Sequence, residues 1–406
     1  MKIWKKIFKQ TFWQISGKVV TSASTLIILG LVTRNYGEAG TGIFTLALTY
    51  LAIFYLLADF GFNAHVLKKL KLNNLPSAEQ NLLVKTEWRK LLGTRIAWSA
   101  ILVVLAVGLL PFWPFTTQEF AKAVMFGSLA IIGSAVFTTC NLIFQSRLRY
   151  DLSILSSSLG VILSLGLFIY PVSLKYPIHF LFLAQLLGWA VIALTSLVLV
   201  KKFLPTVTAI FDRVYIVNLF KHSWPIAATL SLNVVYFRAD SFMVAYFKSM
   251  AEAGIYNLAY QVFQSVLVLP TFIMNSYYPL MLKSLKEIKF VGVSLFFLSF
   301  LGTVFTIILA PLIIKTLTGA GFAGSTQSLQ ILSLGFPAYF LSSLMMWLMV
   351  SKGRYQKMLL IYSIGLIFNL ILNLSYIPRY SYLAACWITV ISEYLILILQ
   401  IIILRR

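Results

Sequence analysis

The feature that most constrains this chain is a series of long apolar segments, separated by short polar ones, that runs from end to end. About 20 mainly apolar residues are enough for a helix to cross the hydrocarbon core of a bilayer. Hydrophobic residues make up 60% of the sequence and charged residues only 11%, which is too apolar for a soluble domain. The sequence therefore predicts an all-α membrane protein with twelve transmembrane helices, near 12–33, 42–64, 91–112, 120–146, 152–172, 178–200, 224–247, 253–279, 290–314, 328–350, 358–378 and 382–404.

The first segment follows a basic start, as a signal peptide would. It is longer than a signal peptide's apolar region and lacks a clear small-residue cleavage site. We therefore expect it to be retained as the first span.

The net charge of +22 raises the alternative of a nucleic-acid partner, so the positions of the cations matter. With the amino terminus inside, every inner segment carries at least two Lys or Arg residues, and every outer loop carries one. The inner loop 65–95, which ends at Arg95, is the richest. This pattern follows the positive-inside rule. The charge therefore predicts cytoplasmic termini and contact with anionic membrane lipids, not binding to nucleic acid.

The two halves of the chain repeat each other. Gly42-Ile-Phe-Thr-Leu-Ala47 corresponds to Gly254-Ile-Tyr-Asn-Leu-Ala259, in the second span of each half. Each half has six spans, so both begin on the same side and would be related by a pseudo-two-fold axis along the membrane normal. We expect an amino-terminal six-helix lobe at 1–200, a cytoplasmic linker at 201–222 and a carboxyl-terminal lobe at 223–406, with a central cavity between the lobes.

The seventh span carries Arg238 and Asp240 deep in its interior. Ionisable groups at that depth usually face a bundle interior or a wet cavity. The two residues lie about 200° apart around a helix and cannot pair with each other. Counting depth from the turn that follows places Gln261 level with Arg238 and Tyr260 near Asp240, and Asn257 is a further polar candidate for the cavity. We interpret Arg238 as a functional cation. For Asp240, proton or sodium handling and the anchoring of a neighbouring side chain both remain open.

Two other pairs of polar residues share a depth on consecutive spans. Lys18 and Asp59 lie at similar distances from the first outer turn, so Lys18 is either paired with Asp59 or a free cation in the cavity. Glu393 and Asn369 are comparably deep on either side of the last outer turn. A hydrogen-bonded structural pair is the favoured interpretation there, and a proton relay is the alternative. Arg34 lies at the outer interface.

Enzymatic chemistry has little support in the sequence. A membrane glycosyltransferase or polymerase needs acid–base groups near a membrane face, but the outer loops are short and contain few carboxylates. Cys140 and Cys386 both fall inside spans and offer no disulfide framework. No nucleophile–histidine or metal-ligand pattern is present. We therefore expect no catalytic residue, no metal and no cofactor.

Several short motifs, taken in order, resemble the polysaccharide (O-antigen) flippase family of the multidrug/oligosaccharidyl-lipid/polysaccharide exporter superfamily. Each motif alone is weak, and the ordered set that runs through the whole chain is the signal. The motifs are Arg34-Asn-Tyr-Gly37, Ala58-Asp-Phe-Gly61, Tyr236-Phe-Arg-Ala-Asp240 with Gly254-Ile-Tyr-Asn-Leu-Ala259, Leu317-Thr-Gly319 through Leu329-Gln-Ile-Leu332, and Asn369 through Ile377-Pro378.

The resemblance implies two six-helix lobes around a central cavity in the cytoplasmic membrane of a prokaryote. It also implies movement of an undecaprenyl-pyrophosphate-linked oligosaccharide to the outer leaflet by alternating access. Other polysaccharide assembly proteins are candidate partners, and coupling to H+ or Na+ is left open. A pyrophosphate that leaves water needs fixed donors, and we assign this task to Arg238, Lys18 and Arg34. Peptidoglycan-precursor flippases of the same superfamily usually have additional carboxyl-terminal spans and more basic residues in the first span. Here twelve spans are expected, and only Lys18 and Arg34 supply basic residues at the first span. This difference favours the polysaccharide branch.

A cation-coupled exporter of small compounds is the alternative within transport. Such a protein needs acidic groups in its cavity. Asp59, Asp240 and Glu393 are the residues that keep this alternative open.

Overall fold

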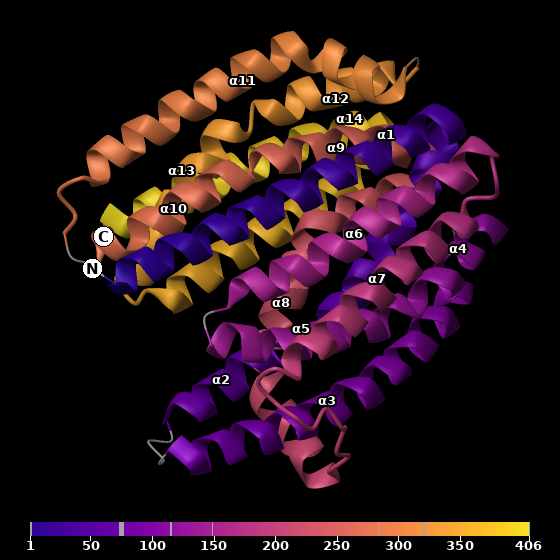
Figure 1. The fold of residues 1–406 in the computed structure, drawn as a ribbon. Coiled ribbons are helices and arrows are strands. Elements are labelled where there is room, and N and C mark those ends of the chain that lie inside the picture. The colour runs from indigo at the N-terminus through magenta and orange to yellow at the C-terminus, as the bar shows by residue number, and fades with distance from the viewer. Residues whose placement is uncertain are drawn as a thin grey trace. The chain divides into compact units, whose positions relative to one another are not determined.

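The chain is helical throughout the part that can be described. The computed structural model describes residues 2–72, 77–113, 116–147, 149–282, 284–319 and 321–405, and within these ranges it contains helices and turns but no strand (Figure 1). The expected all-α fold is confirmed. The elements are α1 (Lys2–Asp59), α2 (Phe62–Leu72), α3 (Ser77–Gly108), η1 (Leu110–Phe112), α4 (Gln118–Ser128), α5 (Ala130–Ser146), α6 (Tyr150–Ser173), α7 (His179–Val200), α8 (Arg213–Phe247), α9 (Met250–Val266), α10 (Val268–Met281), α11 (Ile288–Thr318), α12 (Ala323–Ser333), α13 (Phe336–Ser351) and α14 (Tyr355–Arg405).

Two of these helices are too long to cross a membrane once. α1 has 58 residues and α14 has 51, which at 1.5 Å per residue gives about 87 and 77 Å, against roughly 30 Å of hydrocarbon. Each is interrupted by a residue with non-helical backbone angles. Gly37 has φ 64° and ψ −166°, and Ser381 has φ 57° and ψ −147°. Each long helix therefore supplies two spans.

The number of spans agrees with the twelve expected. Among the described residues, eight helices are long and apolar enough to cross a membrane, and α12 with α13 forms a ninth span bent by 43°. Counting α1 and α14 as two spans each and adding the 35-residue α8 gives twelve. The protein is therefore a multi-pass membrane protein.

The helices group into two compact units. Unit 1 consists of Met1–Ile28 and Ala47–Val235, and unit 2 consists of Leu29–Leu46 and Tyr236–Arg406. Within unit 1, α7 packs against α4, α5 and α6, and α3 packs against α5. Within unit 2, α11 runs beside α12 and α13, and α14 packs against α13, α12 and α9 (Figure 1). The segment Leu29–Leu46 thus packs in unit 2, although the sequence on both sides of it belongs to unit 1.

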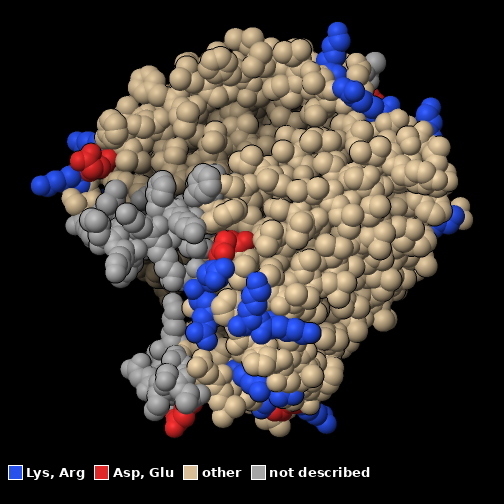
Figure 2. Space-filling view, viewed as in Figure 1, with Lys and Arg blue, Asp and Glu red and all other residues tan. Residues whose placement is uncertain are grey.

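The outer surface of α11 is strongly apolar. Phe290, Phe305, Ile308 and Leu312 are 71%, 60%, 66% and 61% exposed. On a protein in water such a surface would drive association, whereas in a bilayer it meets lipid chains. Figure 2 agrees with this, because the charged side chains on the visible face gather in a few groups and leave wide areas uncharged.

The polar segment between α7 and α8 is fastened to α3 inside unit 1. The Ile210 amide donates to the Arg89 carbonyl at 3.0 Å, and the Arg89 Nε donates to the Thr208 carbonyl at 3.1 Å. Lys90 and Asp212 form an ion pair at 2.7 Å, and the hydrogen bond from Lys90 lowers the pKa of the Asp212 carboxyl. The first part of the expected linker, 201–222, is therefore held against unit 1.

Arg95 is buried instead of lying in a cytoplasmic loop. Its side chain is fully buried, and Nη2 donates to the Asp59 carboxylate at 2.8 Å and to the Asp59 carbonyl at 3.1 Å. Nη1 donates to the Thr139 hydroxyl at 3.3 Å, and the Phe62 ring lies 5.7 Å from the guanidinium. Asp59 therefore pairs with Arg95 and not with Lys18. The depth count missed this pair because α3 begins at Ser77, so position 95 already lies inside the helix bundle.

We predict that Asp59→Asn destabilises the protein, because it leaves the buried Arg95 without its counter-ion. Losing a charged hydrogen bond of this kind costs about 1.5–3 kcal/mol. The matched control is Asp151→Asn, whose partner Arg149 lies 2.9 Å away in a largely exposed pair worth roughly 0–1 kcal/mol. Thermal unfolding of the two purified variants in detergent should show a clearly larger fall in apparent Tm for Asp59→Asn. Equal shifts would contradict the assignment.

Candidate functional site

A group of polar side chains lies inside unit 2, where α8, α9 and α14 meet. α8 contributes Tyr236, Arg238 and Asp240 at alternate positions. Each of the three binds a partner on another helix of the unit, and Arg238 and Asp240 bind different partners. Alternate positions of a helix face different directions, so this short stretch of α8 ties several helices together.

Arg238 is held by two uncharged neighbours on α9. Its Nη2 donates to the Gln264 side-chain oxygen at 3.0 Å, and its guanidinium lies 5.6 Å from the centre of the Tyr260 ring. The side chain is only partly buried. A guanidinium carries five N–H donors, and the described residues accept one hydrogen bond from it. Within the described residues Arg238 therefore has no ion pair, and it retains N–H donors that could bind an anion.

Asp240 is buried, and its hydrogen-bond donors are uncharged groups. The Tyr256 hydroxyl donates to one carboxylate oxygen, and the Thr389 hydroxyl approaches the same oxygen at 3.4 Å. The Ser241 amide donates to the other oxygen at 2.8 Å. This arrangement joins α8 to α9 and α14, as the anchoring interpretation expects. Proton or sodium handling by Asp240 stays a hypothesis.

Glu393 has a different partner from the one the sequence predicts. The Tyr236 hydroxyl donates to the Glu393 carboxylate, which is 3% exposed. Asn369 instead donates to the hydroxyl of Ser392 at 3.2 Å and accepts a hydrogen bond from Asn373 at 2.8 Å. Consecutive helical residues point about 100° apart. Ser392 therefore faces Asn369, and Glu393 faces α8.

Asn257 links two segments that are far apart in the sequence. Its side-chain nitrogen donates to the Thr45 hydroxyl at 3.1 Å, and its side-chain oxygen accepts a hydrogen bond from the Ser241 hydroxyl at 2.7 Å. Thr45 and Asn257 are 212 residues apart, which is also the spacing of the repeated motif. Both lie in unit 2.

The three cations expected to bind pyrophosphate have different surroundings. Arg34 lies in unit 2, where its Nε donates to the Leu317 carbonyl at 3.1 Å and its Nη2 donates to the Thr316 carbonyl, both at the end of α11. Lys18 lies in unit 1, is exposed, and has no ion pair with any residue in the described ranges. Arg238 alone belongs to the polar group of unit 2.

The sequence did not single out Tyr256, Gln264 or Thr389 as partners. Tyr256, Tyr260 and Gln264 are spaced four apart and so share one face of α9, which is the signal that identifies them. Asn257 and Gln261, which the sequence analysis expected in the cavity, each lie one residue further along α9 and so on the neighbouring face of the helix. Tyr260, which the depth count placed near Asp240, lies against Arg238, and Gln264 binds Arg238 where Gln261 was expected.

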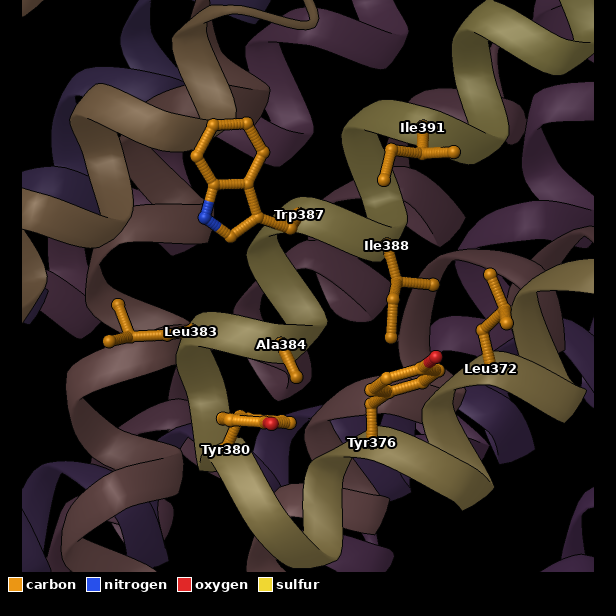
Figure 3. Close-up of a pocket in the computed structure, with 8 residues that line it drawn as sticks. All are labelled: Leu372, Tyr376, Tyr380, Leu383, Ala384, Trp387, Ile388 and Ile391. Atoms are coloured by element: carbon orange, nitrogen blue, oxygen red, sulfur yellow. The ribbon is translucent and has the colours of Figure 1, made fainter.

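An apolar pocket of about 490 Å³ lies between the two halves of α14. Figure 3 shows Trp387, Tyr376 and Tyr380 around it together with aliphatic side chains. No charged residue lines the pocket, so it suits hydrocarbon rather than an anionic headgroup. The lining residues are Leu372, Tyr376, Tyr380, Leu383, Ala384, Trp387, Ile388 and Ile391.

Solved structures of transporters share this fold. A lipid II flippase, MurJ, in an inward closed conformation aligns with a TM-score of 0.74 at 14% identity, covering 98% of this chain and 88% of that one. An inward-facing multidrug resistance MATE family transporter of the MOP superfamily aligns with a TM-score of 0.69 at 12% identity, covering 97% of each chain. A MOP superfamily transporter from Pyrococcus furiosus aligns with a TM-score of 0.59 at 14% identity, covering 99% of this chain and 95% of that one.

A search of curated proteins finds no match. The sequence does match a family model. The model described as polysaccharide biosynthesis protein matches residues 7–285, which is more than half of the chain. The resemblance seen in the ordered motifs is thereby confirmed, and the chain belongs to the polysaccharide biosynthesis protein family.

Proposed function

We propose that this protein moves an undecaprenyl-pyrophosphate-linked oligosaccharide from the cytoplasmic to the outer leaflet of a prokaryotic cytoplasmic membrane. The observation that carries the proposal is the state of Arg238. It is a partly buried cation among membrane-spanning helices, it is held by Gln264 and Tyr260, and it forms no ion pair with any of the described residues. Family membership supports polysaccharide assembly as the process.

A pyrophosphate is chemically suited to Arg238. Guanidinium presents a planar fork of donors that matches two oxygens of a phosphate, and such charge-assisted hydrogen bonds are roughly twice as strong as neutral ones. The attraction also strengthens where water is scarce, because the local dielectric constant is low. Gln264 and Tyr260 orient the guanidinium without cancelling its charge. Lys18 is a second candidate for contact with the headgroup, and the prenyl chain stays in lipid.

A cation-coupled exporter of small compounds fits the acidic residues less well. Such a protein needs carboxylates that can bind a cation. Asp59 is paired with Arg95, while Asp240 and Glu393 accept hydrogen bonds from tyrosine hydroxyls. An enzyme remains the less favoured class, since the family and its structural relatives are transport proteins.

We predict that Arg238→Gln lowers the amount of surface polysaccharide at least tenfold. The amount is measured in a strain that lacks its own flippase and expresses this protein instead. The lost charge-assisted interaction is worth about 1.5–3 kcal/mol, which is roughly 10- to 150-fold in binding. Arg149→Gln, which removes an exposed cation, should leave the amount unchanged, and Arg238→Lys should give an intermediate value. Protein levels in the membrane are matched by immunoblot. Normal polysaccharide with Arg238→Gln would rule out the role assigned to Arg238.

We predict that Glu393 is structural, so that Glu393→Gln keeps near-normal surface polysaccharide and apparent Tm. A glutamine oxygen can still accept the hydrogen bond from Tyr236. Glu393→Leu leaves that buried hydroxyl without an acceptor, at a cost of about 1–3 kcal/mol, and should lower the apparent Tm. If Glu393→Gln is well folded but inactive, Glu393 exchanges a proton during transport, and the structural interpretation is wrong.

A further inference from the structure

The apolar pocket of α14 is a groove built from one stripe of side chains on each half of the helix (Figure 3). On the first half, Leu372, Tyr376 and Tyr380 are spaced four residues apart and so share one face. The second half supplies the other stripe, also at helical spacing, with Leu383, Ala384, Trp387, Ile388 and Ile391. The volume of about 490 Å³ lies within the range of roughly 300–1,000 Å³ that is usual for ligand pockets.

The groove has the depth of one leaflet of a bilayer. Because α14 supplies two spans, the break between them at Ser381 lies at a face of the membrane. The lining residues furthest from this break are Leu372 on one half and Ile391 on the other. At 1.5 Å per residue they lie about 15 Å from it along the helix, and half of the hydrocarbon core is also about 15 Å thick. The groove therefore runs from the membrane face towards the midplane, as an acyl chain of one leaflet does.

The walls of the groove are exposed aromatic side chains. Tyr376, Tyr380 and Trp387 are 46%, 62% and 47% exposed, and the rings of Tyr376 and Tyr380 lie 6.2 Å apart with 25° between their planes. Tyrosine and tryptophan are enriched where a membrane meets water, because each combines an apolar ring with a polar group. An exposed face that has no charged lining residue suits lipid chains better than a water-filled path. The ligand of such a groove therefore comes from the membrane.

One positive charge lies at the membrane-face end of the groove. From Leu372 to Ile391 the sequence contains a single charged residue, Arg379, next to Tyr380 and close to the break. Arg379 is exposed and forms no ion pair with any described residue. The Ser381 hydroxyl at the break is buried and has no hydrogen-bond partner within the described ranges. A cation and a hydroxyl at the membrane face, beside an apolar groove, suit a phosphate headgroup that carries an acyl chain.

We propose that the groove of α14 binds one anionic phospholipid, with an acyl chain along the groove and the phosphate beside Arg379. The prenyl chain of a transported lipid is the alternative occupant, but an undecaprenyl chain is much longer than one leaflet is thick. A single cation also suits the single negative charge of a phosphodiester better than a pyrophosphate. The bound lipid contacts both halves of α14 and ties the two spans together. This site does not depend on the proposed transport function.

Quenching of Trp387 fluorescence tests the binding of the lipid. The full-length protein is placed in phosphatidylcholine nanodiscs that contain increasing amounts of phosphatidylglycerol brominated in the middle of its acyl chains, since bromine quenches tryptophan on contact. The signal of Trp387 is the difference between the protein and Trp387→Phe. Half of this signal should be lost at a mole fraction of brominated phosphatidylglycerol about fivefold lower than that needed with brominated phosphatidylcholine. Equal mole fractions for the two lipids would overturn the proposal, because the groove would then hold only the surrounding bilayer lipid.

Two variants and a control separate the groove from the rest of the apolar surface. Arg379→Gln should remove the preference of Trp387 for phosphatidylglycerol, and so should Ala384→Phe, which fills the groove with a larger side chain. Phe305→Trp on α11 is the control, since position 305 is 60% exposed on an apolar face and its added fluorescence should be quenched equally by both lipids. A preference that persists in Arg379→Gln, or that appears equally at position 305, would show that the proposal is wrong. Arg379→Gln changes an exposed side chain, so it decides the question even if Ala384→Phe does not fold.

A polyprenyl phosphate distinguishes the two kinds of hydrocarbon. When it is added in an amount equal to the brominated phosphatidylglycerol, the quenching of Trp387 should stay unchanged. Relief of the quenching would assign the groove to the tail of a transported lipid and contradict the proposal. None of these measurements requires transport, so the lipid site and the proposed function stand or fail separately.

Discussion

Polar groups inside a membrane-spanning bundle have no water to bind, so each must find its partner on a neighbouring helix. This constraint determines much of the interior of both units. In unit 1 the buried Arg95 gathers Asp59 and Thr139 around it. In unit 2 the carboxylates of Asp240 and Glu393 gather tyrosine hydroxyls from other helices. Apolar packing in a bilayer gains little from excluding lipid, and these polar contacts therefore do more to choose which helices meet.

The same constraint explains how far the sequence could be interpreted. Span length and hydropathy act on every residue of a segment, so twelve spans and an all-α fold were predictable from composition along the chain. A partner is one side chain on one face, and depth counting fixes its height but not its direction. Gln261 was therefore expected to bind Arg238, but Gln264, about one turn further on, binds it instead. Likewise Asn369 was expected to bind Glu393, but it binds the neighbouring Ser392. Asp59 pairs with Arg95 because α3 enters the bundle earlier than its basic start suggests.

The internal repeat shows a second limit of prediction from sequence. A spacing of 212 residues says that Gly42 and Gly254 occupy equivalent places, but equivalence does not require contact. The structure adds that the two residues touch, and that Thr45 and Asn257 bind each other three residues further along. Glycine at both places has a physical explanation only once this crossing is known. The packing of the two glycines thus gives the repeated motif a physical explanation.

The number of cations within the spans is a poor guide to how an anionic substrate is bound. Arg95 is neutralised by Asp59, whereas the N–H donors of Arg34 bind neutral carbonyls at the end of α11 and its charge stays in place. Arg238 lies among the polar side chains of unit 2, where an amide oxygen and an aromatic ring orient its guanidinium. A transporter must also release what it binds, and a single oriented guanidinium attracts a pyrophosphate without the very slow dissociation that a cluster of cations would produce. Of the three cations that the sequence suggested, Arg238 is therefore the one on which we base the proposed function.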